Sequence, residues 1–239
     1  MGQQGFCRAY AEFDEIELPT GNKTMHKTEN IIFDLGGVLY SLDFDTLWDG
    51  FRRTCGKTIS EIQETLYGDG LLISYECGKI SSMEYYEAIV HGLESKMSFT
   101  DFKAIWNSLL VRREDMFRIV MKLKGYSNIY VLSNTNEINA EVLDVDLEPV
   151  TSNIIYSFQV GCMKPDQAIY ETALKKWCIS PESSVFIDDV WENCEGARSA
   201  GIAPHVFSEV GPFLRFLKEA GIILDTQSLD LVSYNFPLS

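Results

Sequence analysis

The chain has 239 residues, of which 46% are hydrophobic and 23% are charged, and its formal net charge is −15. This composition is typical of a folded globular protein. The acidic balance argues against binding to nucleic acid or to an anionic membrane surface, because both carry negative charge. It permits a small anionic substrate wherever a metal ion and a basic side chain reverse the field locally.

Residues 1–28 are interpreted as an N-terminal extension. They lack the basic start and continuous apolar stretch of a signal peptide, and no segment of the sequence is apolar over the length of a bilayer. The six cysteines are scattered without a C-x-x-C pair, which favours free thiols in a reducing compartment. We therefore expect a cytoplasmic protein. The sequence does not distinguish a monomer from a homodimer.

Short apolar runs alternate with amphipathic segments along most of the chain. Such runs are typical of buried parallel strands, and the segments between them have helical spacing. The predicted strands are residues 30–33, 129–132, 154–156, 185–187 and 205–207, and the predicted helices are residues 116–124, 167–177 and 193–200. This alternation predicts an α/β fold with a doubly wound, Rossmann-like parallel sheet.

A different pattern interrupts this alternation after the first strand. Ser60-x-x-Gln63 and Ser81-x-x-Glu84 match the capping box that starts many helices, and Thr100-Asp101 starts a third predicted helix. We interpret this segment as a small inserted α-helical cap. The predicted domains are a cap of residues 45–111 and a core of residues 29–44 and 112–239.

Polar side chains follow three of the predicted strands: Asp34, Ser133-Asn134 and Asp188-Asp189. In an open parallel sheet, ligands bind beyond the carboxyl ends of the strands, near the point where the strand order reverses. Two adjacent acids are costly to bury without a cation, which favours a metal site at Asp188-Asp189. Lys164, in a loop after the strand at 154–156, supplies the positive charge that an anionic substrate needs there.

Four segments, in this order, resemble the motifs of the haloacid dehalogenase (HAD) superfamily. They are Ile31–Leu39 with its Asp34-Leu35-Gly36-Gly37, Val131–Asn136, Met163-Lys164-Pro165 and Phe186–Asp189. One apolar run ending in Asp is common, but four motifs in register are specific, and the match covers roughly residues 30–220. The residues of these motifs are most similar to those of subfamily IA, which includes glucose-1-phosphate phosphatases and the N-terminal phosphatase domain of soluble epoxide hydrolase.

The resemblance implies a Mg²⁺-dependent phosphatase that acts on a small phosphorylated metabolite. Asp34 would be the nucleophile, and an aspartyl-phosphate would divide one difficult displacement into two easier steps. The implied metal ligands are Asp34, the carbonyl group of Gly36 and Asp189. Asp188 would bind the metal through water or anchor Lys164.

The same resemblance implies a phosphate-binding set. Ser133, Asn134 and the adjacent backbone N–H groups would hold the phosphoryl oxygens. Lys164 would screen Asp34 from the transferred group and favour the ionised form of Asp34. Glu76, Lys79 and Trp106 of the cap either contact the substrate or have ordinary surface and packing roles, and the sequence leaves both open.

One position departs from the family pattern. Most phosphatases of the family have a second Asp two residues after the nucleophile, as general acid and base, and here that position is Gly36. A positioned proton donor is worth about 10²–10⁴-fold in rate. The anomeric oxygen of a sugar 1-phosphate leaves with less protonation than an ordinary alcohol, so Gly36 favours such a substrate. A further hypothesis assigns the missing proton to Asp43 or Asp45 through a water molecule.

Two other functions stay open. A metal-independent hydrolase of the haloacid dehalogenase type is compatible with the fold, although Asp188-Asp189 argues against it. A phosphate-binding regulatory protein with low activity would retain the site but release phosphate poorly.

Overall fold

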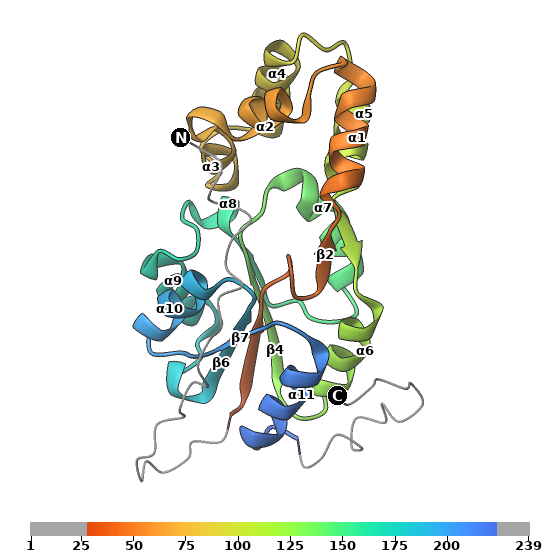
Figure 1. The fold of residues 1–239 in the computed structure, drawn as a ribbon. Helices are drawn as coiled ribbons and strands as arrows, with labels where there is room; N and C mark the ends of the chain where they lie inside the picture. The colour runs from red at the N-terminus through yellow and green to blue at the C-terminus, as the bar shows by residue number, and fades with distance from the viewer. Residues whose placement is uncertain (1–27, 224–239) are drawn as a thin grey trace.

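The computed structural model describes residues 28–223. The predicted N-terminal extension, apart from its last residue, lies outside the described residues. The core is a five-stranded parallel sheet in the order β5-β4-β1-β6-β7. Its strands are β1 (Asn30–Phe33), β4 (Asn128–Ser133), β5 (Ile154–Tyr156), β6 (Ser184–Asp188) and β7 (Ala203–Val206). The chain places β4 and β5 on one side of β1, then returns to the other side with β6 and β7 (Figure 1).

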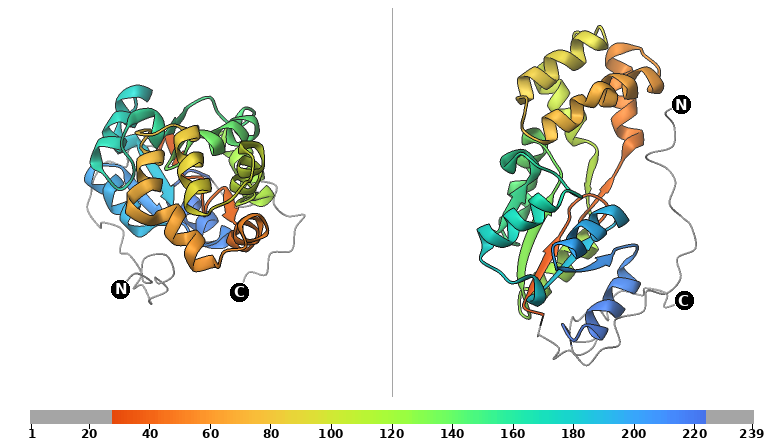
Figure 2. Two further views of the ribbon diagram at one scale, coloured as in Figure 1. Left: turned by 90° about the horizontal axis from the view of Figure 1, so that it is seen from above. Right: turned by 90° about the vertical axis from the view of Figure 1, so that its left-hand side faces the viewer.

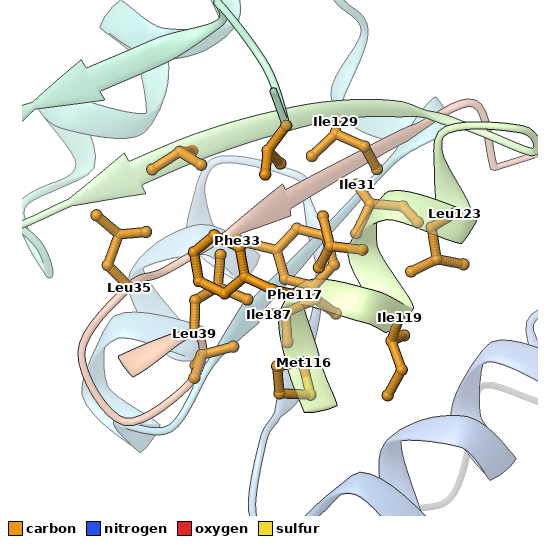
Figure 3. Close-up of a cluster of buried hydrophobic side chains, with 14 of the residues drawn as sticks. Ile31, Phe33, Leu35, Leu39, Met116, Phe117, Ile119, Leu123, Ile129 and Ile187 are labelled. Carbon is orange, nitrogen blue, oxygen red and sulfur yellow. The ribbon is translucent and has the colours of Figure 1, made fainter. Parts of the chain in front are cut away.

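Helices cover both faces of this sheet, which confirms the predicted doubly wound α/β fold (Figure 2). The helices on one face are α6 (Glu114–Leu123), α7 (Glu137–Leu147) and α11 (Val210–Glu219). In Figure 3, Met116 and Phe117 of α6 lie against Phe33 and Ile187 of the strands. Burying a large apolar side chain contributes about 1.5–3 kcal/mol. This layer therefore holds β1 firmly up to the residue before Asp34.

The opposite face has its own apolar layer. The helices between β5 and β7 along the chain are α8 (Ser157–Val160), α9 (Gln167–Trp177), η2 (Pro181–Ser183) and α10 (Trp191–Ser199). Ile169 and Tyr170 of α9 pack on Ile32 and Phe186 of the sheet. The central strands are thus buried on both faces, which explains why their sequences are continuously apolar rather than alternating.

A separate helical layer lies above the carboxyl edge of the sheet (Figure 1; Figure 2, left). It consists of α1 (Phe44–Cys55), α2 (Ile59–Tyr67), η1 (Gly68–Gly70), α3 (Leu71–Glu76), α4 (Ser82–Gly92) and α5 (Phe99–Asn107). These helices share one apolar cluster that includes Phe51, Tyr85 and Phe102. The cluster also contains Ile138 of α7, so the helical layer packs onto the core through that helix.

The helix starts in this layer are defined by capping boxes. The predicted box at Ser81–Glu84 is present at the start of α4. The prediction of a box at Ser60–Gln63 is wrong, because α2 is capped two residues earlier by Thr58–Glu61. Thr58 has extended backbone angles and accepts a hydrogen bond from the N–H of Glu61, as a capping residue must. Likewise α5 begins at Phe99, one residue before the predicted start.

A two-stranded antiparallel ribbon connects the helical layer to the core. It pairs β2 (Tyr40–Leu42) with β3 (Leu110–Arg112). The predicted cap boundaries at residues 45 and 111 remain a proposal; the first lies in α1 and the second in β3. None of the helices in residues 28–223 has the length and hydrophobicity that a membrane crossing requires.

Candidate active site

Three neighbouring strands bring their polar ends together at the carboxyl edge of the sheet. β1 lies between β4 and β6, so Asp34, Ser133 and Asp188 stand side by side. The N–H of Asp34 donates to the carbonyl oxygen of Ile187 at 2.9 Å, which extends the hydrogen-bonding ladder to the acid itself. Asp34 and Asp188 are buried, at 7% and 0% exposure.

Lys164 lies within the same cluster. Its ammonium Nζ is 2.8 Å from Oδ1 of Asp34 and 2.6 Å from Oδ2 of Asp188. Asn134 holds the loop that carries this lysine: its Oδ1 accepts from the N–H of Lys164 at 2.8 Å, and its Nδ2 donates to the Lys164 carbonyl at 2.9 Å. Both polar atoms of the Asn134 side chain are therefore already hydrogen-bonded to the backbone of Lys164. These bonds compete with the predicted contact between this side chain and a phosphate.

Asp188 is surrounded by hydrogen-bond donors. Nδ2 of Asn193 lies 3.1 Å from each of its carboxylate oxygens, and the N–H of Val190 donates to Oδ1 at 2.8 Å. Lys164 provides the remaining contact, to Oδ2. A carboxylate bound in this way is rigid and is well suited to anchor the lysine, which was one of the two roles expected for Asp188.

Asp189 completes a group of three acids with Asp34 and Asp188. One carboxylate oxygen from each lies within 4.8 Å of the others, and Asp189 is the exposed member. Its carboxylate lies over Gly37, where an added Cβ would be 2.1 Å from Oδ2 of Asp189. Gly37 also has φ of +75°, a conformation that glycine adopts at no steric cost. The second glycine of the motif therefore leaves the space that the Asp189 carboxylate occupies.

Burial raises the pKa of Asp34 to about 7, with Lys164 lowering it and Asp188 adding to the rise. Partial burial of its carboxyl group, followed by the charge of Asp188, also raises the pKa of Asp189. Burial lowers the pKa of Lys164, but Asp188 and Asp34 outweigh this and hold it above its usual value. Three carboxylates thus face one ammonium group.

This imbalance is what a divalent cation would correct. Clustered carboxylate oxygens are the ligands that Mg²⁺ prefers, so the residues present fit the implied metal. Asp34 and Asp189 are the acids nearest to solvent in the group, whereas Asp188 is occupied by Asn193 and Lys164. Gly36 and Ser133 lie beside them in the motif loop and at the end of β4, and their roles as ligand and phosphate contact remain proposals.

Two residues have clearer structural roles than the sequence suggested. Trp106 is buried in the helical layer, and its Nε1 donates to Oδ1 of Asn139 at 3.1 Å, so it ties α5 to α7. Arg113 was not singled out from the sequence. Its Nη1 donates to the carbonyl of Gly37 at 3.3 Å and supports the loop under Asp189. No motif marks Arg113, because its partner is a backbone group distant in sequence.

The first hypothetical proton donor is already engaged. Asp43 is the N-cap of α1, where Oδ1 accepts from the N–H of Thr46 and Oδ2 from its hydroxyl. These hydrogen bonds lower the pKa of Asp43. A carboxylate held ionised by a helix end is a poor proton donor at neutral pH.

Comparison with known proteins agrees with this geometry. A family model described as haloacid dehalogenase-like hydrolase matches residues 28–201, a range that contains all four motifs. The chain belongs to this family. It is therefore a HAD-like hydrolase, and the resemblance of its four motifs is confirmed.

Several known proteins are similar over most of the chain. D-ribitol-5-phosphate phosphatase of Bacteroides thetaiotaomicron is 24% identical over 187 residues, covering 72% of this chain and 88% of the relative. The phosphorylated carbohydrates phosphatase of Thermotoga maritima is 29% identical over 188 residues, covering 73% and 82%. A crystal structure of a HAD family enzyme from B. thetaiotaomicron, in complex with magnesium and inorganic phosphate, has a TM-score of 0.70 at 26% identity and covers 78% of this chain and 99% of that chain.

Proposed function

We propose that this HAD-like hydrolase is a Mg²⁺-dependent phosphatase of small phosphorylated metabolites, with sugar or polyol phosphates as the substrate class. The observation that carries the proposal is the buried ion pair between Lys164 and Asp34, set among two further acids. The similar phosphatases of B. thetaiotaomicron and T. maritima, which act on D-ribitol 5-phosphate and on phosphorylated carbohydrates, support the substrate class.

The proposed reaction has two steps. One carboxylate oxygen of Asp34 attacks the phosphorus atom, the bond to the leaving oxygen breaks, and an aspartyl-phosphate forms. Water then attacks the same phosphorus, and the bond to Asp34 breaks to release phosphate. Bound Mg²⁺, held by Asp34, Asp189 and the Gly36 carbonyl, supplies neutralising charge for this chemistry.

The remaining residues hold the reactants. Lys164 keeps Asp34 oriented and offsets its charge as a phosphate dianion approaches. Asp188 fixes the lysine, and Asn134 fixes the backbone of the lysine loop. Ser133, at the end of β4 next to β1, would contact a phosphoryl oxygen bound over Asp34.

Sugar 1-phosphates are the finer proposal for the substrate. Their acidic leaving oxygen compensates for Gly36, which offers no proton donor where most family phosphatases have an Asp. A panel of sugar 1-phosphates, sugar 6-phosphates and polyol phosphates tests this ranking. Preference for ordinary alkyl phosphates over the 1-phosphates would contradict the finer proposal and leave the phosphatase activity intact.

The test of the activity itself is phosphate release from this panel, with Mg²⁺ or with EDTA. We expect release only with Mg²⁺ and a loss of at least about a thousandfold in Asp34→Asn, because the amide cannot act as the nucleophile. Asp49→Asn is the matched control, since Asp49 lies on α1 with its side chain 57% exposed. Metal-independent release of halide from haloacids would support the dehalogenase alternative instead.

A further inference from the structure

The tip of α3 lies at the point where the helical layer meets the core. α3 ends at Glu76, and in Figure 1 it lies directly above α8. At Gly78 an added Cβ would be 2.2 Å from the carbonyl oxygen of Phe158, so the two backbones touch. Gly78 has φ of +64°, and no other residue type could keep this approach without displacing α3 from α8.

A second contact fixes the same tip on its other side. The Tyr75 hydroxyl lies 2.8 Å from Oγ of Ser82 and accepts a hydrogen bond from the N–H of Ile138 at 3.3 Å. Ser82 in turn donates to Oε2 of Glu137 at 2.6 Å. The end of α3 is thus attached to the start of α7 and to α8, both of which belong to the core.

Glu76 lies between these two attachments, with its side chain half-buried. Burial raises the pKa of Glu76 to about 7, the negative charge of Asp34 adds to the rise, and the positive charge of Lys164 opposes it. Glu76 ends α3 at the point where the helical layer contacts the core, and both members of the buried ion pair affect its pKa.

We propose that Glu76 is the general acid and base of this enzyme, in place of the Asp that the family usually has at the position of Gly36. The inference rests on the proposed phosphatase function. In an in-line displacement the leaving oxygen lies opposite the nucleophile. Asp34 follows the last residue of β1, and the helical layer lies above this edge of the sheet, so that oxygen would lie on the side of the cap, where α3 ends at Glu76.

Protons and bonds balance in both steps. As Asp34 attacks, the bond between phosphorus and the leaving oxygen breaks, and the protonated carboxyl of Glu76 gives its proton to that oxygen, which leaves as an alcohol. Water then attacks the aspartyl-phosphate while the Glu76 carboxylate takes its proton. The bond to Asp34 breaks, and Glu76 is protonated again. With a donor in this position, esters of ordinary alcohols also become substrates, so the preference for sugar 1-phosphates that Gly36 alone would impose is reduced.

Two probes test the proposal in the full-length protein with Mg²⁺: p-nitrophenyl phosphate, whose leaving group departs as a stable anion, and ribitol 5-phosphate, whose alcohol needs a proton. For Glu76→Gln we expect kcat with ribitol 5-phosphate to fall by about 10²–10⁴-fold. The initial burst of p-nitrophenolate, which reports formation of the aspartyl-phosphate alone, should slow much less. Glu87→Gln, an exposed acid on α4 of the same layer, is the control.

The outcomes separate this proposal from the proposed function. If wild type is active and Asp34→Asn is inactive, but Glu76→Gln slows both probes equally or changes only KM, Glu76 is a binding residue and the proton-transfer proposal is overturned. Unchanged activity in Glu76→Gln also overturns it. Release of no phosphate from either probe by the wild-type protein would overturn the phosphatase function together with this inference.

Discussion

The core and the cap bury very different side chains. Among the residues that the structure describes, Asp34, Lys164 and Asp188 are the buried charged residues, and all three meet at one edge of the sheet. Within residues 45–111, Ser82 is the one buried polar residue. The cap interior is instead built from stacked and edge-on aromatic rings, such as Tyr75 on Tyr85 at 4.5 Å.

The buried charges of the core and the aromatic packing of the cap serve different purposes, the first the chemistry of the site and the second the cohesion of the cap. Buried charges are tolerated only where each has a partner at close range, and the backbones of β1, β4 and β6 fix those partners. Aromatic packing needs no such register, so the cap is cohesive without being tied to the chemistry. Its polar contacts with the core lie at two places, the end of α5 with Trp106, and the α3 tip with Tyr75, and the α3 tip is the one that carries Glu76.

The largest expected effect comes from removing the buried ammonium group. Lys164→Met keeps much of the side-chain volume but leaves Asp34 and Asp188 without their cation, which should cost about 3–5 kcal/mol of unfolding free energy in EDTA. Phosphate release should also fall at least about a hundredfold. Urea denaturation and the phosphate assay measure these effects.

Lys103→Met is the matched control for this change. Lys103 pairs with Glu141 between α5 and α7, but their side chains are 28% and 54% exposed. An exposed pair of this kind is worth about 0–1 kcal/mol. Equal losses of stability in the two variants would contradict the contrast between the charged sheet edge and the rest of the molecule.

The next prediction concerns His205 and tests whether the core keeps a titratable group neutral where it has no hydrogen-bond partner. Its Nε2 is buried and has no hydrogen-bond partner among the described residues, and the ring stacks on Phe216 at 4.2 Å. Burial lowers the pKa of His205 to about 4. The unfolded chain therefore takes up this proton first, so stability that is present above about pH 6.5 is lost as pH falls toward 4.

His205→Phe should remove this sensitivity. Between pH 7.5 and pH 5, wild type should lose about 2 kcal/mol more unfolding free energy than the variant, from this group alone. Urea denaturation of both proteins at each pH gives the difference, in which the titration of the shared acids cancels. Parallel pH dependence of the two proteins would show that His205 is not held neutral by the fold.

The next prediction tests whether the close approach of Gly37 to the Asp189 carboxylate is required for Mg²⁺ binding. In Gly37→Ala the new Cβ would displace the Asp189 carboxylate, so we expect Mg²⁺ affinity to fall about tenfold or more, measured by Mg²⁺ titration of thermal stability. The positive φ costs about 1–2 kcal/mol as well. Gly56→Ala has a similar φ of +66° with no atom within 4 Å of its Cβ, so it should share the second effect and not the first. Loss of Mg²⁺ affinity in both variants would contradict the fit argument.

The sequence predicted the parts of the fold that depend on local pattern. Helix 167–177 matches α9 because Asp166 caps it through the N–H of Ala168 at 3.0 Å, a signal that lies next to the helix itself. The central strands were found because strands buried on both faces are continuously apolar. The start of α2 was misplaced because Thr58-x-x-Glu61 and Ser60-x-x-Gln63 both fit the capping pattern, and only the backbone angles distinguish them.

The contacts between segments that are distant in sequence could not be predicted from such local patterns. The sequence placed acids at the ends of strands, and a parallel sheet brings such ends together whatever the loops do. It gave no reason for Arg113 to reach Gly37, or for Gly78 to lie against Phe158, since neither pair forms a motif. The place of Glu76 at the contact between cap and core follows from that second contact, so it depends on how the cap docks.

The smallest expected effect tests that docking directly. Tyr75→Phe keeps the ring stacked on Tyr85 but removes the hydroxyl that joins α3 to Ser82 and to the N–H of Ile138, at a cost of about 1 kcal/mol. Because these bonds hold the cap on the core, we expect KM for phosphate monoesters to rise several-fold. Tyr85→Phe loses a hydroxyl that donates to the carbonyl of Leu66 within the cap, at 3.2 Å. It should reduce stability by a similar amount and leave KM unchanged, so equal KM values in the two variants would show that the α3 contacts do not govern closure.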